Sequence, residues 1–164
     1  MKIYVMRHGP AEDQARSGRD FDRKLTNGGR KRTELVAREL ATRGQQPRRI
    51  VSSPLVRALE TAKVVIATLH LDLDTETREE LAPGGDALAL VRELAATEAR
   101  RVLLVGHEPD VSGLTARLFP SWSRGFDKAM VVGLRLDRDA LAGGSKRESH
   151  AELRFIIEPT TLGN

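Results

Sequence analysis

The chain of 164 residues contains no cysteine. Disulfides, zinc sites built on cysteine and thiol nucleophiles are therefore excluded, and we expect the protein in the cytoplasm. Aromatic residues are few, with one Trp, one Tyr and four Phe, and they do not alternate with basic residues as stacking platforms for nucleic acid do. No apolar run approaches the roughly 20 residues of a membrane span, and the N-terminus does not resemble a signal peptide. We therefore expect neither nucleic acid nor a membrane as a partner.

The rest of the composition is that of an ordinary globular protein, with 40% hydrophobic and 30% charged residues. The length suits one core, and we expect residues 1–164 to form a single domain. The net charge of +4 is mild and compatible with an acidic substrate. Pairs of opposite charge at helical spacing, such as Glu34 with Arg38, favour a solvated surface as its main cause. Composition does not indicate an oligomeric state.

Strand-like and helix-like segments alternate along most of the chain. Apolar runs predict strands, and apolar residues at helical spacing predict helices. In the first expected helix, residues 27–43, the buried face is expected to hold Val36, Leu40 and Leu35. In the second, residues 54–69, Ser53 is expected as the N-cap and Pro54 as the first helical residue. The expected strands are 3–7, 49–52, 72–75 and 102–106, and the expected helices are 27–43, 54–69, 86–98 and 109–119.

The last third of the chain has a different pattern. Residues 130–136 and 152–158 predict two strands, and the polar connector 142–148 between them predicts a hairpin at the sheet edge. Strands that alternate with helices imply a largely parallel sheet that is covered on both faces. We therefore predict an α/β fold, a three-layer α/β/α sandwich whose mostly parallel sheet has an antiparallel edge.

Three of the predicted strands lead into reactive side chains. The N-terminal strand ends at Arg7, His8 and Gly9, the third long strand ends at His107, and the second leads into a helix with Arg57 near its start. The carboxyl ends of parallel strands meet at one edge of the sheet, where ligands bind in open α/β folds. The expected pocket therefore has two imidazoles, two guanidiniums and free N–H groups at helix N-termini, which together suit a dianionic phosphate.

In such a pocket one imidazole can attack phosphorus and form a covalent phosphohistidine, while the other hydrogen-bonds the equatorial oxygens. Because the cations already neutralise the phosphate, neither a metal nor another cofactor is required. A zinc site would need carboxylates such as Glu12 or Asp13 beside the two histidines, and the guanidiniums would oppose a dication. The other histidines, His70 and His150, lie in polar surroundings and are expected at the surface.

Four segments resemble the signature motifs of the histidine phosphatase superfamily, which has the phosphoglycerate mutase-like fold. They occur in the family's order and extend over most of the chain. The short length and the segment 80–86 resemble more narrowly the small bacterial phosphohistidine phosphatases of the SixA type. The four segments are Arg7-His8-Gly9, Leu25-Thr26-Asn27-Gly28-Gly29, Ser52-Ser53-Pro54-Leu55-Val56-Arg57-Ala58-Leu59-Glu60-Thr61-Ala62 and Val105-Gly106-His107-Glu108-Pro109.

The resemblance implies a role for each residue of the expected pocket. It makes His8 the nucleophile and places Arg7, Arg57 and His107 with it in the catalytic set around the phosphoryl group. Arg23, just before the Leu-Thr segment, becomes a further candidate for a substrate contact. The substrate-binding residues that the resemblance implies are Arg7, Arg57, Gly9 and Arg23.

The chain departs from the family in one place. Many members carry a glutamate general acid after the third strand, but here the equivalent position falls near Ala82 or Pro83. A missing acid suits a phosphoramidate, whose weak P–N bond needs less help than the bond of an alkyl phosphate ester. If an acid is required, the candidates are Glu80, Asp86, Glu12 and Asp13.

The connection between the minor strand and the next helix is short, whereas larger relatives insert substrate-binding structure there. A short connection leaves the pocket open, with residues 10–22 as a mobile loop over it. An open pocket favours a phosphoryl group on a protein side chain, so we predict a protein phosphohistidine phosphatase that works through phospho-His8. Two alternatives stay open: a phosphomonoesterase of a small metabolite or nucleotide, and a non-catalytic module that binds phosphate or a phosphoprotein.

Overall fold

The structure, a computed structural model, describes residues 1–142 and 151–163. The strands are β1 (Lys2–Arg7), β2 (Arg49–Ser52), β3 (Thr75–Thr77), β4 (Arg101–Gly106), β5 (Val131–Leu136) and β6 (Ala151–Ile157). The helices are α1 (Asn27–Thr42), α2 (Val56–Leu69), α3 (Ala87–Ala95), α4 (Asp110–Leu118) and α5 (Arg138–Leu141). Short 3-10 turns are η1 (Asp20–Asp22), η2 (Glu79–Leu81) and η3 (Pro159–Thr161).

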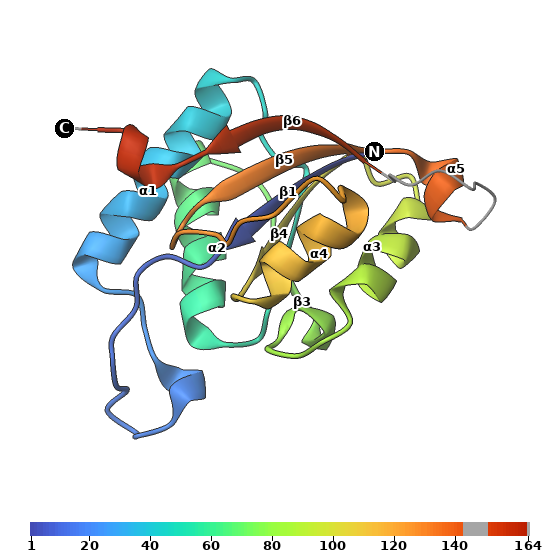
Figure 1. Cartoon of the computed structure of the whole chain (residues 1–164). Coiled ribbons are helices and arrows are strands. Elements are labelled where there is room, and N and C mark those ends of the chain that lie inside the picture. The colour runs from blue at the N-terminus through green and yellow to red at the C-terminus, as the bar shows by residue number, and fades with distance from the viewer. Residues whose placement is uncertain (143–150, 164) are drawn as a thin grey trace.

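The strands of the described residues form one mixed sheet in the order β3-β2-β4-β1-β5-β6 (Figure 1). β1 and β4 run parallel, as do β4 and β2 and then β2 and β3. β5 is antiparallel to β1, and β6 is antiparallel to β5. The predicted sheet, mostly parallel with an antiparallel edge, is confirmed.

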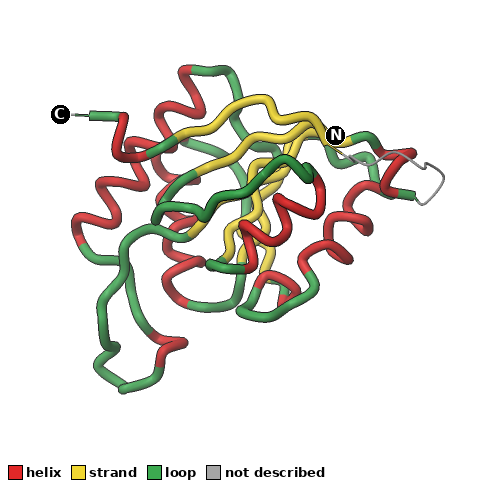
Figure 2. Tube along the Cα trace, viewed as in Figure 1, coloured by secondary structure: helices red, strands yellow, loops and turns green. Residues whose placement is uncertain are grey.

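Helices cover both faces of the sheet, as Figures 1 and 2 show. Side chains alternate along β1, so Ile3 and Val5 pack in the layer of α3 and α4, whereas Tyr4 and Met6 pack in the layer of α1 and α2. Leu40 of α1 is fully buried, and burial of one such leucine contributes about 1.5–3 kcal/mol. The three-layer α/β/α architecture is therefore confirmed.

Several local predictions differ from the structure. The second helix does not start at Pro54, because Leu55 has an extended backbone with ψ of 138° and the helix begins only at Val56. Leu35 is 42% exposed, since it lies on α1 next to the buried Val36 but off the face that packs on the sheet. The short helix α5 was not predicted. His70 is exposed as predicted, whereas His150 and residues 143–148 of the polar connector lie outside the described residues.

The sheet register brings the turns after β1, β2 and β4 to one edge. Arg7 is opposite Gly106 in the β1–β4 pair, and Ser52 is opposite Val105 in the β2–β4 pair. The pairing continues past the strands, because the N–H of His8 donates to the carbonyl oxygen of Gly106 at 3.0 Å. The three reactive segments therefore meet at this edge. Within the described residues, no helix is long and apolar enough to cross a membrane.

Candidate active site

The turn after β1 holds Gly9 close against two helices. Its N–H donates to the hydroxyl of Thr61 in α2 at 3.0 Å. A β-carbon at Gly9 would lie 2.6 Å from Oγ1 of Thr33 and 3.1 Å from the carbonyl oxygen of Gly29, both in α1. Only a glycine permits this approach of the turn to α1. Gly9 therefore fixes the course of the chain directly after His8.

The imidazole of His8 is buried, with 6% of the residue exposed. Burial lowers its pKa to about 4, and the charges of Arg57 and Arg7 act in the same direction, against a hydrogen bond to Gly9. The ring is therefore neutral at pH 7. Nδ1 lies 2.7 Å from the carbonyl oxygen of Gly9, which can only accept. Nδ1 therefore carries the proton, and Nε2 is unprotonated, with its lone pair accepting the Nε–H of Arg57.

Arg57 links His8 to the loop before α1. It is the second residue of α2, and its Nε lies 3.3 Å from Nε2 of His8. Its terminal nitrogens donate to the backbone oxygen of Asp20 at 2.9 Å and to Oδ2 of Asp20 at 3.1 Å. Arg23 pairs with the same carboxylate at 2.8 Å. The two guanidiniums, Arg23 more than Arg57, hold the pKa of Asp20 below its usual value, so Asp20 is a carboxylate.

No sequence pattern marked Asp20, because its contact with Arg57 joins residues that are 37 positions apart. The segment 10–22 that contains Asp20 was expected over the pocket, and Asp20 is the residue through which it touches Arg57. The carboxylate is 62% exposed, whereas the Arg57 side chain is only 7% exposed. Asp20 therefore approaches Arg57 from the solvent side of the pocket.

Arg7, at the end of β1, faces the loop before β5. Its Nη1 donates to the carbonyl oxygen of Phe126 at 2.7 Å. The N–H of Phe126 in turn donates to Oε1 of Glu108 at 2.8 Å. The Nε of Arg7 is buried and has no hydrogen-bond partner among the described residues. Arg7 is thus held by one terminal nitrogen, and its Nε–H can donate to a bound anion.

His107 follows β4 and lies beside His8, with the ring centroids 5.1 Å apart and the rings tilted by 53°. Its Nε2 lies 2.7 Å from Oγ of Ser53. Its Nδ1 is buried without a hydrogen-bond partner in the described part of the chain. Burial is the main cause that lowers the pKa of His107 to about 3, and the neighbouring His8 ring and the charge of Arg57 act in the same direction. His107 is therefore also a neutral imidazole at pH 7.

The structure thus brings together the four residues that were expected as the catalytic set. Two guanidiniums and two neutral imidazoles share one buried corner, and such a set can bind a phosphoryl group and transfer it to a ring nitrogen. Arg23 reaches this cluster only through Asp20. Across the described ranges, no group of three or more His, Cys, Asp or Glu residues has a geometry that could hold a metal ion.

Three of the four predicted candidates for a general acid have other partners, and the fourth, Asp13, is exposed. Glu80 forms an ion pair with Arg78 at 2.5 Å, which holds the pKa of Glu80 below its usual value. Asp86 caps α3 and accepts the N–H of Ala89 at 3.1 Å. Glu12 accepts the N–H of Lys24 at 3.0 Å. The structure therefore engages Glu80, Asp86 and Glu12 elsewhere and shows none of the four candidates in contact with His8.

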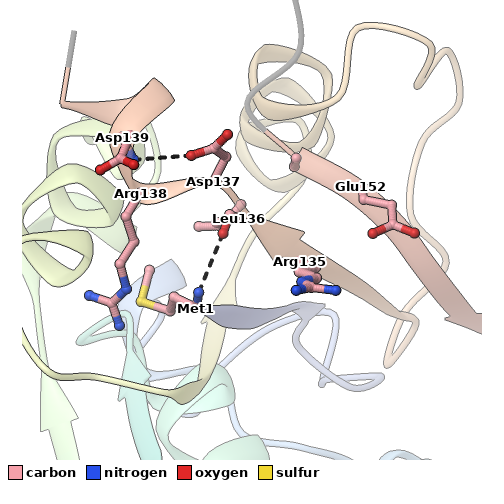
Figure 3. Close-up of a pocket in the computed structure, with 8 residues that line it drawn as sticks. Met1, Arg135, Leu136, Asp137, Arg138, Asp139 and Glu152 are labelled. Atoms are coloured by element: carbon pink, nitrogen blue, oxygen red, sulfur yellow. Dashed lines mark hydrogen bonds between the residues drawn. The ribbon is translucent and has the colours of Figure 1, made fainter. Parts of the chain in front are cut away.

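A cavity of about 580 Å³ lies at the opposite edge of the sheet, where β1 starts and β5 ends (Figure 3). There the N-terminal ammonium donates to the carbonyl oxygen of Leu136 at 3.3 Å. Its charged lining is mixed, since Arg135 and Arg138 line it together with Asp137, Asp139 and Glu152. The cavity is separate from the corner that holds the two histidines, because it lies at the other end of the strands.

The chain matches known proteins along its length. The family model of the histidine phosphatase superfamily (branch 1) matches residues 3–82. Phosphohistidine phosphatase SixA of Escherichia coli strain K12 is 34% identical over 123 residues, which cover 73% of this chain and 75% of that protein. This chain belongs to the histidine phosphatase superfamily. An uncharacterized protein of Picosynechococcus is 35% identical over 171 residues, which cover 99% of both proteins.

The similarity of this histidine phosphatase to its relatives extends to the fold. The structure of the protein histidine phosphatase SixA complexed with tungstate has a TM-score of 0.87 and 28% sequence identity. The match covers 99% of this chain and 100% of that one. The phosphoglycerate mutase-like fold that the motifs implied is therefore confirmed, and the protein is a phosphatase.

Proposed function

We propose that this phosphatase hydrolyses phosphohistidine on a protein and that the reaction passes through a covalent phospho-His8. The state of His8 carries the proposal: the ring is neutral, its Nδ1 is engaged by the carbonyl oxygen of Gly9, and Nε2 is 3.3 Å from Arg57. A neutral imidazole whose Nε2 is unprotonated is a competent nucleophile. The guanidinium beside it is the group that would hold a phosphoryl group against that nitrogen.

In the first step of the proposed reaction, Nε2 of His8 attacks phosphorus and the P–N bond of the substrate breaks. The electron pair of that bond goes to the substrate nitrogen, so a substrate ring that is protonated on its other nitrogen leaves as neutral imidazole. Arg7 and Arg57 bind the phosphoryl oxygens, and His107 hydrogen-bonds them as charge builds. In the second step, water attacks phosphorus, the electron pair returns to Nε2 of His8, and inorganic phosphate leaves with the protons of the water.

The positions of the carboxylates support a P–N bond as the target. An alkyl phosphate ester needs a proton on its leaving oxygen, and three of the four predicted acids, Glu80, Asp86 and Glu12, have other partners. Glu80 is held ionised by Arg78, and Asp20 is held ionised by Arg23 and Arg57. An imidazole that brings its own proton leaves without help from a protein acid. The E. coli relative is itself named phosphohistidine phosphatase SixA, which also supports this substrate.

The short connection between β3 and α3 supports a phosphoryl group displayed on a protein. It consists of residues 78–86 and contains only the turn η2 as regular structure. A long insertion at this place would enclose a small substrate, and this chain has none there. We propose accordingly that residues 1–164 act as one phosphatase domain on a phosphorylated protein partner, and we expect it in the cytoplasm.

The experiment compares three substrates: a phosphohistidine peptide, the same peptide with phosphoserine, and a small aryl phosphate. We expect the kcat/KM of the wild type to be highest for the phosphohistidine peptide. For His8→Ala we expect a loss on the order of a thousandfold or more, as is usual when a nucleophile is removed. The phosphoryl label that the wild type acquires should be acid-labile and alkali-stable, and His8→Ala should not acquire it.

His70→Asn is the matched control, because it also removes a histidine, but an exposed one at the end of α2. His70 has the left-handed conformation with φ of 50°, which asparagine tolerates. It should keep the activity of the wild type. Equal kcat/KM for the phosphohistidine and phosphoserine peptides would contradict the proposed substrate. Wild-type activity in His8→Ala would contradict the proposed mechanism.

A further inference from the structure

Ser53 is fully buried at the end of β2 and has a hydroxyl that the helix does not use. Its N–H continues the β2–β4 ladder by donating to the carbonyl oxygen of Val105 at 3.0 Å. Its Oγ accepts the N–H of Leu55 at 3.2 Å and lies 2.7 Å from Nε2 of His107. The expected role as a helix cap is wrong, because α2 begins later, at Val56. The hydroxyl instead joins the turn after β2 to the histidine after β4.

The hydrogen bonds around Ser53 determine which ring nitrogen of His107 carries a proton. The ring is neutral, so one nitrogen is protonated and the other is not. If Ser53 donates its proton to Nε2, its oxygen still accepts the N–H of Leu55, and the Nδ1–H of His107 is the one polar group of the pair left without a partner among the described residues. If Nε2 were protonated and donated to Oγ, the hydroxyl proton would need another acceptor, and the described residues offer none in hydrogen-bond contact with it.

We propose that Ser53 is a positioning residue that fixes His107 as the tautomer with its proton on Nδ1. Nδ1 is the nitrogen that has no partner among the described residues, so its N–H is the donor that His107 has left for a phosphoryl oxygen. The opposite tautomer would present a lone pair to that oxygen, which repels it. This consequence for catalysis rests on the proposed function, whereas the tautomer itself does not.

The tautomer can be measured without any activity. In protein labelled with ¹⁵N and ¹³C in its histidines, the chemical shifts of each ring near pH 7 report which nitrogen is protonated, and loss of one set of signals in His107→Gln assigns the ring. We expect Nδ1 of His107 to be protonated and Nε2 to be a lone-pair nitrogen in the wild type. A protonated Nε2 in the wild type would overturn the proposal.

Variants then test whether Ser53 is the cause. Ser53→Ala should shift His107 toward the tautomer protonated on Nε2 and lower kcat on the order of tenfold to a hundredfold, with a smaller change in KM, because the lost interaction develops in the transition state. Ser53→Thr keeps the hydroxyl and should restore both the wild-type tautomer and most of kcat. An unchanged tautomer in Ser53→Ala would overturn the proposal.

Ser52→Ala is the matched control. Ser52 is the preceding residue, is also fully buried, and donates its hydroxyl only to the backbone oxygen of Ser53 at 2.9 Å. It should lose stability as any buried serine does but keep the His107 tautomer and kcat. If Ser52→Ala shifts the tautomer as much as Ser53→Ala, the assignment to the Ser53 hydroxyl is wrong. If His8→Ala stays active while His107 carries its proton on Nδ1, the proposed function fails and the tautomer stands.

Discussion

Asp20 competes with a phosphoryl group for Arg57, and Asp20→Ala should therefore tighten the binding of inorganic phosphate. In the structure, each nitrogen of the Arg57 guanidinium makes one hydrogen bond: Nε donates to Nε2 of His8, and both terminal nitrogens donate to Asp20. We expect a bound oxyanion to displace the carboxylate, because both would accept hydrogen bonds from the terminal nitrogens of Arg57. Removal of the carboxylate leaves the backbone oxygen of Asp20 in place, so the loop keeps one of its two contacts with Arg57.

The magnitude follows from the exposure of the pair. The Asp20 carboxylate is 62% exposed and 3.1 Å from Arg57. An exposed ion pair contributes about 0.2–1 kcal/mol, which converts to an affinity change of about 1.4- to 5-fold. The Ki of phosphate as a product inhibitor should fall by that factor in Asp20→Ala. The gain should shrink at high salt, because the pair is open to counterions.

Asp22→Ala provides the control for this measurement. Asp22 lies in the same turn, η1, but pairs with Arg19 and Ser17 and has no contact with Arg57. Its Ki for phosphate should equal that of the wild type. Weaker phosphate binding in Asp20→Ala would refute the reasoning, since it would mean that Asp20 holds Arg57 in place for phosphate and does not compete with it.

Two further predictions concern stability. Burial lowers the pKa of His8 to about 4 from the usual 6.5, so the unfolded chain binds a proton at this ring first as the pH falls. The stability that the neutral ring contributes is therefore present above pH 6.5 and is lost as the pH falls toward 4. Between pH 6.5 and pH 4, the free energy of unfolding measured with urea should therefore fall by about 1.4 kcal/mol less per pH unit in His8→Asn than in the wild type. Equal slopes in the two proteins would contradict the buried neutral ring. In α1, Gly29→Ala should lower the free energy of unfolding by about 1–3 kcal/mol, because the new β-carbon would overlap the carbonyl oxygen of Pro10. Gly28→Ala should raise it by about 0.4–1 kcal/mol, because there the new β-carbon meets nothing closer than 3.9 Å. Thermal unfolding of the two variants tests this, and shifts of the same sign would argue against the close approach.

Much of the site could be predicted because its residues are tied to strand ends. An apolar run that stops at a reactive side chain is a local pattern, and the rule that parallel strands share one ligand edge converts three local patterns into one place. Arg7, His8 and His107 were located in this way, and Arg57 followed from its helix. The alternation of strand and helix patterns along the chain was equally local, which is why the layers were predicted correctly.

The errors occurred where one side chain has two possible partners. The Ser-Pro pattern predicted a cap at Ser53, but His107, 54 positions away, lies close to that hydroxyl. Asp20 belongs to a loop without a repeating pattern of apolar residues. Nothing in the neighbouring sequence therefore indicated that its side chain contacts Arg57. Leu35 was placed on the buried face because it is apolar, although the face that packs on the sheet passes through Val36 and Leu40 and leaves it 42% exposed.

The sequence by itself therefore determined the succession of the strands and of helices α1 to α4 along the chain, the layered fold and the residues that meet at the ligand edge. Periodicity and strand ends depend on neighbouring positions, which is why the sequence shows them. Only the tertiary structure decided the hydrogen-bond partners of those residues. His8 is paired with the carbonyl oxygen of Gly9, Arg57 with Asp20, and His107 with Ser53. Partners such as Asp20 and Ser53 come from segments tens of residues apart. A donor or acceptor has no fixed partner until the chain is folded, and the protonation state of each ring follows from that choice.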